Sequence, residues 1–81
     1  MRVIVNVQLK NGVLDPQGKA VHHALSSLKF NEVDDVRIGK QIILEITETD
    51  TNKAKETVTK MCEELLANTV IEDYTIEFPA C

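Results

Sequence analysis

Adjacent histidines, His22 and His23, are the side chains of this sequence most suited to binding a metal or moving a proton at neutral pH. Neighbouring residues of a helix diverge by about 100°, so the two rings cannot easily grip one ion. Zinc sites on helices use ligands four residues apart, and no set of His, Cys or carboxylate residues here supplies a full ligand shell. We expect the pair to lie on a solvated helix face, with partner contact as the alternative.

Two pairs of acidic neighbours, Asp34-Asp35 and Glu63-Glu64, are the candidates for general acid–base chemistry. That chemistry needs two carboxylates that face one substrate from contrasting environments. Adjacent strand residues face opposite ways and adjacent helix residues diverge, so neither pair can share a substrate. Both pairs are therefore expected to be solvated charge.

The cysteines and glycines complete the search for reactive groups. Cys62 falls in an apolar helix stripe and Cys81 is the last residue of the sequence, so we expect two reduced thiols without a role. The three glycines match neither a phosphate-binding loop nor a dinucleotide-binding pattern. We therefore predict no catalytic residue, no cofactor-binding residue and no metal ligand.

Composition excludes several classes of partner. Nine basic residues against 13 acidic residues leave a net charge of −4, which disfavours binding to nucleic-acid phosphates or to an anionic membrane surface. No apolar run approaches the roughly 20 residues that span a bilayer. The sequence shows no pattern of a signal peptide, and we expect a cytoplasmic protein.

The first half of the sequence predicts a strand followed by a helix. Residues 1–10 alternate between apolar and mainly polar side chains, as a strand with one buried face does. Asp15 can cap the free amides of a helix, and Pro16 suits its first position. The helix should end near Lys29. Its apolar stripe consists of Val21, Ala24, Leu25 and Leu28.

The second half predicts a hairpin, a second helix and a last strand. Residues 33–38 and 42–46 read as two strands joined by a turn at Gly39-Lys40. Asp50 or Thr51 should cap a helix that Asn68 closes. Its stripe consists of Ala54, Val58, Met61, Cys62, Leu65 and Leu66. Residues 74–78 alternate again, and Pro79 stops the last strand.

This order predicts one domain over residues 1–81, with α+β architecture. The expected fold is ferredoxin-like βαββαβ: a four-stranded antiparallel sheet with two helices on one face. On the other face Ile4 and Ile43 lie among polar residues, so we predict that they form a homodimer interface.

In that fold three connections emerge at one end of the sheet, which we call the shared end. Its residues are Asp15, Pro16, Gln17, Gly18, Arg37, Gly39, Lys40 and Asn68. A structural cap beside a solvated turn, a docking site for a partner protein and a site for a small anion remain open. If a partner docks here, alanine at Arg37 or Lys40 should weaken complex formation more than folding.

The motifs at this end also resemble a known family. Residues 13–20 (VLDPQGKA), 36–40 (VRIGK), 62–68 (CEELLAN) and 70–74 (VIEDY) are similar, in order and spacing, to the small PurS subunit of phosphoribosylformylglycinamidine synthase. The resemblance covers nearly the whole chain. It departs from the family at Lys29-Phe30, where Gly usually precedes the aromatic residue, and at Thr69, which replaces a frequent Pro. A left-handed Lys29 would cost about 1 kcal/mol, unless Asn31 takes over that conformation.

The resemblance implies a ferredoxin-like homodimer in a three-part complex. A glutaminase subunit (PurQ) hydrolyses glutamine, and a synthetase subunit (PurL) uses the ammonia and ATP, with Mg, to convert formylglycinamide ribonucleotide (FGAR) to the amidine (FGAM). The small subunit bridges the two and carries no catalytic residue and no cofactor. The rival hypothesis is a free-standing regulatory domain that binds a small metabolite.

Overall fold

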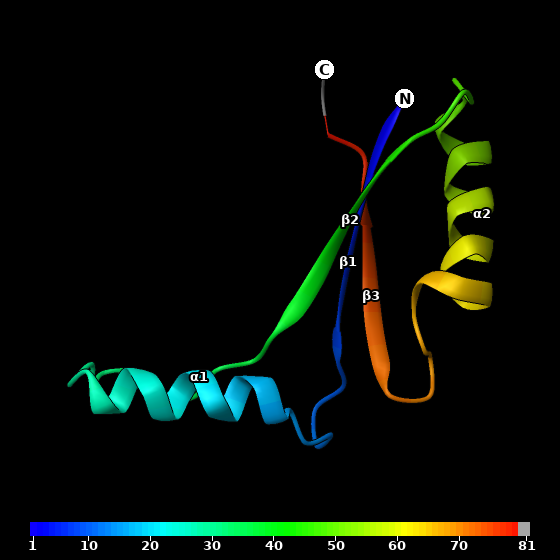
Figure 1. Ribbon diagram of the computed structural model, residues 1–81. Coiled ribbons are helices and arrows are strands. Elements are labelled where there is room, and N and C mark those ends of the chain that lie inside the picture. Colours follow the sequence, from blue (N-terminus) through cyan, green and yellow to red (C-terminus); the bar gives the residue numbers. More distant parts are fainter. Residues whose placement is uncertain (80–81) are drawn as a thin grey trace.

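The computed structural model describes residues 1–79 as a three-stranded antiparallel sheet with helices at two places around it (Figure 1). The strands are β1 (Arg2–Leu9), β2 (Gly39–Glu45) and β3 (Glu72–Glu77), in the spatial order β2-β1-β3. Both neighbours run antiparallel to β1. Cys81, for which we predicted a free thiol, lies outside the described residues.

The alternation predicted for β1 is confirmed. Val3, Val5 and Val7 are buried on one face, opposite Leu44 and Ile42 on β2 and Ile76 and Tyr74 on β3. Because the side-chain period of a strand is two, this register places every apolar strand residue of the core on the same face. The sheet therefore has one apolar face and one open face.

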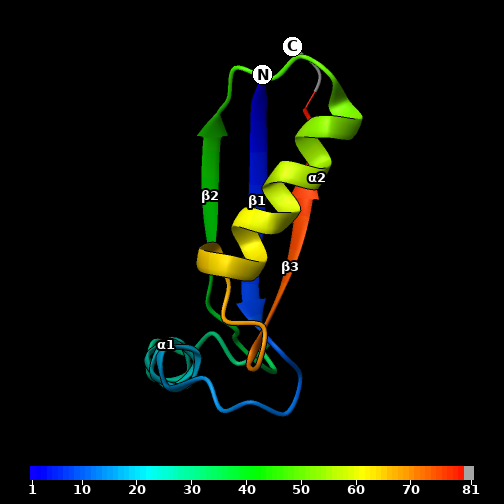
Figure 2. The same cartoon turned by 90° about the vertical axis from the view of Figure 1, so that its right-hand side faces the viewer.

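Helix α2 (Thr51–Met61) covers the apolar face (Figure 2). The carboxylate of Asp50 accepts hydrogen bonds from the first amides of the helix, as predicted. Ala54, Val58 and Cys62 are buried against the sheet. This packing forms the hydrophobic core of the chain.

The C-terminal end of this helix departs from the prediction. Residues Cys62–Leu66 form a π-helical turn, η1, in which the Ala67 amide donates to the Cys62 carbonyl oxygen at 3.0 Å. The wider turn rotates the side chains, and Leu65 is 83% exposed although the stripe predicted it to be buried. The prediction that Asn68 closes the helix is also wrong, since the cap is Ala67.

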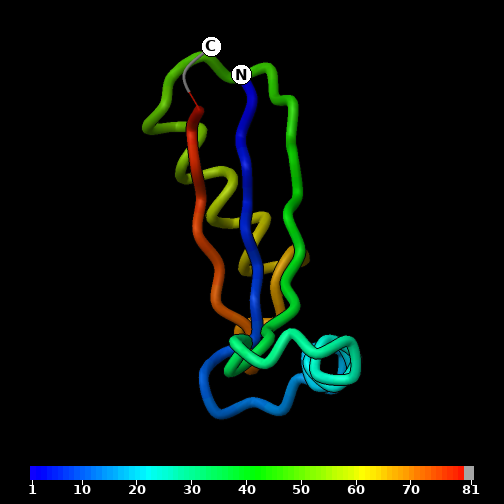
Figure 3. Tube along the Cα trace, turned by 90° about the vertical axis from the view of Figure 1, so that its left-hand side faces the viewer, coloured from blue at the N-terminus to red at the C-terminus, as the bar shows by residue number. Residues whose placement is uncertain are grey.

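Helix α1 (Pro16–Ser27) begins at the predicted cap but does not pack on the sheet. It projects from the side of the sheet opposite α2, near the end where β2 begins (Figures 1 and 3). Residues 28–38 return beside the helix, and Nε2 of His22 donates to the Val33 carbonyl oxygen at 2.9 Å. We call residues 16–38 the arm.

The predicted four-stranded ferredoxin-like sheet is therefore wrong. Residues 33–38 form no strand, and Gly39-Lys40 begins β2 instead of turning a hairpin. Strand β1 pairs with β2 along one edge and with β3 along the other. Residues 33–38 therefore cannot form a strand beside β1. Its partly buried residues Val33, Val36 and Ile38 belong to the return of the arm and to its junction with the sheet. The α+β composition of the fold stands.

The end of α1 resolves the choice between Lys29 and Asn31. Lys29 has a φ of 72°, and its amide donates to the Ser26 carbonyl oxygen at 3.0 Å. The Phe30 amide donates to the Leu25 carbonyl oxygen at 3.0 Å, which completes a left-handed helix cap. The strain thus falls on a lysine, which pays a steric cost that glycine avoids.

Replacing Lys29 with glycine should stabilise the chain. We expect the free energy of unfolding to rise by up to about 1 kcal/mol, because glycine takes this φ without steric cost. Urea denaturation followed by circular dichroism measures the change. Asn31→Gly is the control and should give no gain, since Asn31 has no positive φ. Equal stability of Lys29→Gly and wild type would contradict the account of the cap.

Candidate functional site

Strand register brings three distant segments to the shared end. Leu9 lies opposite Glu72, and Gln8 lies opposite Gly39. The Lys10 amide then donates to the Ile71 carbonyl oxygen at 2.8 Å, which ties the loop after β1 to the loop before β3. The predicted meeting of these segments at one end of the sheet is therefore observed, although the sheet around them has three strands.

An open hollow of about 320 Å³ lies at the centre of this end. Its lining includes Asp15, Pro16, Gln17, Gly39, Lys40 and Glu72. Asn68 joins the group through Glu72, because the Asn68 amide donates to the Glu72 carboxylate at 2.6 Å. In return the Glu72 amide donates to the Asn68 carbonyl oxygen at 2.7 Å. Gly18 and Arg37 do not line this hollow.

Asp15 is the anchor of the shared end. Its side chain is buried, with 4% exposed, and each carboxylate oxygen accepts one backbone hydrogen bond. Oδ1 accepts from the Gly18 amide at 2.8 Å and Oδ2 from the Ile38 amide at 2.7 Å. These two bonds, and then the Arg37 guanidinium nearby, hold the pKa of Asp15 below its ordinary value of 3.8 against the opposing effect of burial. One charged side chain thus connects the start of α1 to the start of β2.

Arg37 fixes the loop that leads into α1. Its Nη1 donates to the Val13 carbonyl oxygen at 3.0 Å, and its Nη2 donates to the Lys10 carbonyl oxygen at 3.1 Å. Gly18 allows the arm to close on itself, because a Cβ at this position would collide with the Val36 carbonyl oxygen. Arg37 and Gly18 therefore maintain the shape of the shared end.

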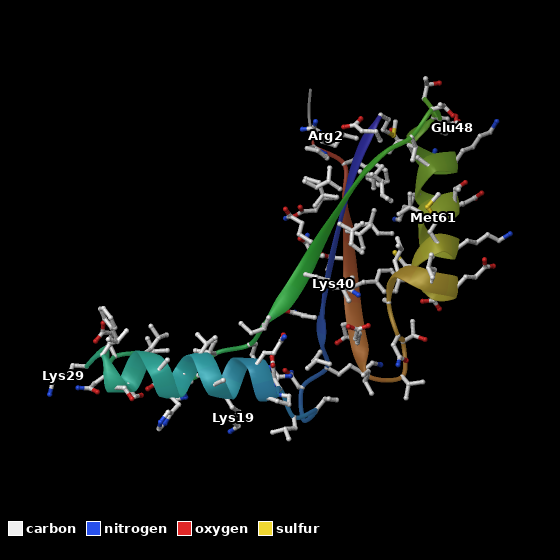
Figure 4. All side chains as sticks on the ribbon, viewed as in Figure 1. Arg2, Lys19, Lys29, Lys40, Glu48 and Met61 are labelled. Carbon is white, nitrogen blue, oxygen red and sulfur yellow. The ribbon has the colours of Figure 1, made fainter. Side chains whose placement is uncertain are left out.

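Gln17 and Lys40 are two of the exposed members of the predicted set. Both are exposed, and Lys40 lies on β2 where the strand leaves the arm (Figure 4). Within residues 1–79 neither side chain makes a hydrogen bond or an ion pair. A lysine beside the free amides of a helix start suits an acidic or carbonyl-rich surface of a partner.

The sequence alone did not identify Glu72 as part of this end. It stands where β3 begins, so the register with Leu9 places it beside the hollow. Its only signal in the sequence is its place in the motif at residues 70–74, where the last strand begins. A position so close to a strand boundary cannot be assigned without knowing the register.

Cys62 belongs to the hydrophobic core, and Tyr74 packs against that core. Burial, followed by the charge of Glu63, raises the pKa of the Cys62 thiol, which keeps it protonated and a weak nucleophile. A hydrogen bond from Tyr74 to Glu63 raises the pKa of that phenol. In the described part of the chain no three His, Cys, Asp or Glu side chains form a group that could hold a metal ion. None of its helices has the length and apolar character needed to cross a bilayer.

The open face of the sheet holds the predicted dimer residues. Ile4 on β1 lies directly opposite Ile43 on β2, and Ile43 is 56% exposed. Polar pairs flank them: Gln41 donates to Asn6 at 3.0 Å, and Arg2 lies 2.8 Å from Glu45. The open face thus carries one apolar pair between polar pairs.

Replacing Asp15 with asparagine should weaken the chain at neutral pH. The amide group offers one acceptor oxygen, so either Gly18 or Ile38 would face an NH₂ group instead of an acceptor. Because folding lowers the pKa of Asp15, the carboxylate stabilises the folded chain fully at pH values above 3.8. This stabilisation is lost as the pH falls through the lower pKa that Asp15 has in the folded state.

The midpoint of thermal unfolding should therefore be lower for Asp15→Asn than for wild type at pH 7. The difference between the two midpoints should become smaller at pH values below 3.8. Circular dichroism across this range measures it. A gap that stays constant with pH would show that the charge of Asp15 is not the stabilising feature.

Comparison with known proteins shows the family to which the chain is similar. A family model described as PurS, phosphoribosylformylglycinamidine (FGAM) synthase, matches residues 2–80. The phosphoribosylformylglycinamidine synthase subunit PurS of Bacillus subtilis is 58% identical over 76 residues, which cover 94% of this chain and 89% of the relative.

Solved structures agree with this placement. A crystal structure of PurS from Bacillus subtilis has a TM-score of 0.84 and 58% identity, with 94% of each chain covered. A chain in the structure of PurLQS from Thermotoga maritima has a TM-score of 0.86 and 38% identity, covering 94% of this chain and 93% of that one. The chain therefore belongs to the PurS family of phosphoribosylformylglycinamidine (FGAM) synthase.

Proposed function

We propose that the chain is the small docking subunit of FGAM synthase in purine biosynthesis, and that it bridges the glutaminase and synthetase subunits. The observation that supports this most is the shared end. Segments that carry the family motifs converge there on an open, rigidly held surface without a nucleophile, an acid–base pair or a metal site among the described residues. Such a surface can position other proteins but cannot carry out the reaction itself.

The chemistry then belongs to the partners. In our proposal a PurQ-type subunit releases ammonia from glutamine, and a PurL-type subunit uses ATP with Mg to place that nitrogen on FGAR and form FGAM. The Thermotoga maritima structure, described as PurLQS, contains a relative of this chain together with L and Q subunits by name. We place the complex in the cytoplasm, treat residues 1–81 as one PurS-like domain, and assign no cofactor to it.

We further propose that the chain works as a homodimer through Ile4 and Ile43. The exposure of Ile43 and its pairing with Ile4 across the open face support this assignment. A dimer would offer two shared ends, and each could dock one set of partners.

Reconstitution tests the proposal. The purified chain is mixed with the synthetase and glutaminase subunits, and FGAM formation from glutamine is compared with the same mixture lacking the chain. We expect glutamine-dependent activity only when the chain is present. Activity that does not change on omission would overturn the proposal.

Calorimetry with amino acids and nucleotides provides the complementary measurement. The isolated chain should show no tight binding, because the hollow at the shared end is open and would leave much of a small ligand in contact with water. Tight binding of a metabolite would favour the regulatory domain instead.

Among the docking residues, Lys40 gives the cleanest prediction. We expect Lys40→Ala to weaken assembly with the two partners by roughly tenfold, as loss of a charge-assisted hydrogen bond does, while thermal stability stays unchanged. Lys55→Ala on the outer face of α2 is the matched control and should bind normally. Equal binding by the two variants would remove Lys40 from the docking surface.

Arg37→Ala should behave differently from the expectation based on sequence alone. Its guanidinium donates to two loop carbonyls, so the substitution should loosen the arm as well as the complex. Thermal melts beside the binding assay separate the two effects. If Arg37→Ala loses binding to the partner subunits but keeps the thermal stability of wild type, Arg37 contacts a partner directly.

A further inference from the structure

Three large apolar side chains stay exposed between α2 and β3. Leu65 on η1 is 83% exposed, and in the loop that follows Val70 is 81% and Ile71 38% exposed. Leu65 and Val70 are five residues apart in sequence, so their Cα atoms lie at most about 18 Å apart. A standard interface covers about 800 Å² of each partner, which is wide enough to include both. One partner surface can therefore cover all three side chains.

The π-helical turn is what exposes Leu65. In a regular helix Leu65 would continue the buried stripe, seven residues after Val58 and three after Cys62. Instead the Ala67 amide bonds the Cys62 carbonyl oxygen, and Leu66 takes the place against the core. Single π-helical turns of this kind are frequent at functional sites. The turn thus keeps one leucine out of the core of the chain itself.

Asn68 holds the loop after η1 in a fixed shape. Its side-chain oxygen accepts a hydrogen bond from the Val70 amide at 3.2 Å. Its carbonyl oxygen accepts from the Ile71 amide at 3.0 Å and from the Glu72 amide at 2.7 Å. A loop that is already ordered loses little conformational freedom when a partner binds. Val70 is therefore presented in a pre-formed conformation.

The charge of this part of the chain is strongly negative. Residues 61–81 contain five of the 13 acidic residues and none of the nine basic ones, so the other residues are together close to neutral. Glu63 and Glu64 stand on η1 itself, and both are exposed. Lys10 lies 3.8 Å from Asp73 and offsets that one charge. Such a surface attracts a basic protein and repels a second copy of itself.

The proposed homodimer leaves this surface free. That dimer uses Ile4 and Ile43 on the open face, whereas η1 and the loop after it lie on the α2 side of the sheet (Figures 1 and 2). A bridging subunit must also hold two different proteins, and the hollow beside Lys40 offers one surface for this. An acidic second surface would meet the other requirement.

We propose that Leu65, Val70 and Ile71 form a second docking surface for one partner subunit, which contacts them through apolar side chains flanked by lysine or arginine. The inference rests on the bridging role of the proposed function and gives that role a second point of attachment. An apolar centre with charged residues around it has the usual anatomy of a protein interface. The charge of residues 61–81 selects a basic partner.

Titration of matched variants into a mixture of the two partner subunits tests this surface. The readout is the concentration of chain that gives half-maximal glutamine-dependent formation of FGAM. Leu65→Gln keeps a good helix former and removes the apolar end of the side chain, so we expect this concentration to rise at least about tenfold. Glu56→Gln on the outer face of α2 is the control and should match wild type.

Salt separates the charge from the apolar contact. For wild type the half-maximal concentration should rise with ionic strength, because salt screens the attraction between exposed charges. Glu64→Gln should reduce this dependence, whereas Glu56→Gln should keep it. Equal salt dependence of Glu64→Gln and wild type would overturn the assignment of a basic partner.

Photo-crosslinking identifies the occupant. A benzophenone side chain at position 70 should crosslink to the synthetase or to the glutaminase subunit in the active mixture. A crosslink to a second copy of the chain instead would overturn the proposal.

The same titration distinguishes this inference from the proposed function. If the mixture needs the chain but Leu65→Gln acts at the concentration of wild type, the second surface is wrong and the proposed function stands. If activity does not depend on the chain at all, both are wrong. Circular dichroism checks the fold of each variant, and Val70→Thr, which keeps the shape of the side chain, replaces Leu65→Gln if that variant does not fold.

Discussion

Two oxygens of one carboxylate connect the helix to the sheet in this chain. Asp15 accepts the Gly18 amide at the start of α1 and the Ile38 amide just before β2, within a site that is almost closed to water. A buried carboxylate is stable only when such donors surround it, so the two elements cannot separate without exposing or protonating it. The shape of the shared end and the direction of the arm both depend on this contact.

The sheet brings the other segments of the shared end close to this contact. Because β1 pairs with β2 on one side and β3 on the other, the loops at its end lie side by side although they are far apart in sequence. The core that supports them is small and covers only one face, with Val5, Val58 and Cys62 at its centre. This small core leaves much of the surface of the chain exposed.

The sequence predicted those elements whose signals are local. The cap at Asp15, the alternation of β1 and the cap at Asp50 each depend on a few neighbouring residues, and all three are observed. The four-stranded sheet was wrong because the apolar spacing of residues 33–38 also suits an extended return beside a helix. The outward turn of Leu65 was missed because nothing in the sequence marks a π-helical turn. Helix α1 projects from the sheet, and helical periodicity alone does not report where a helix lies relative to a sheet.

We propose that partner subunits bind at the shared end. Lysine acetylation, mapped by mass spectrometry on the chain alone and in the assembled complex, tests it most directly. Lys40 should lose reactivity on assembly with the synthetase and glutaminase subunits, while Lys55 on α2 should label equally in both states. An active complex in which Lys40 labels as fast as in the free chain would contradict the account.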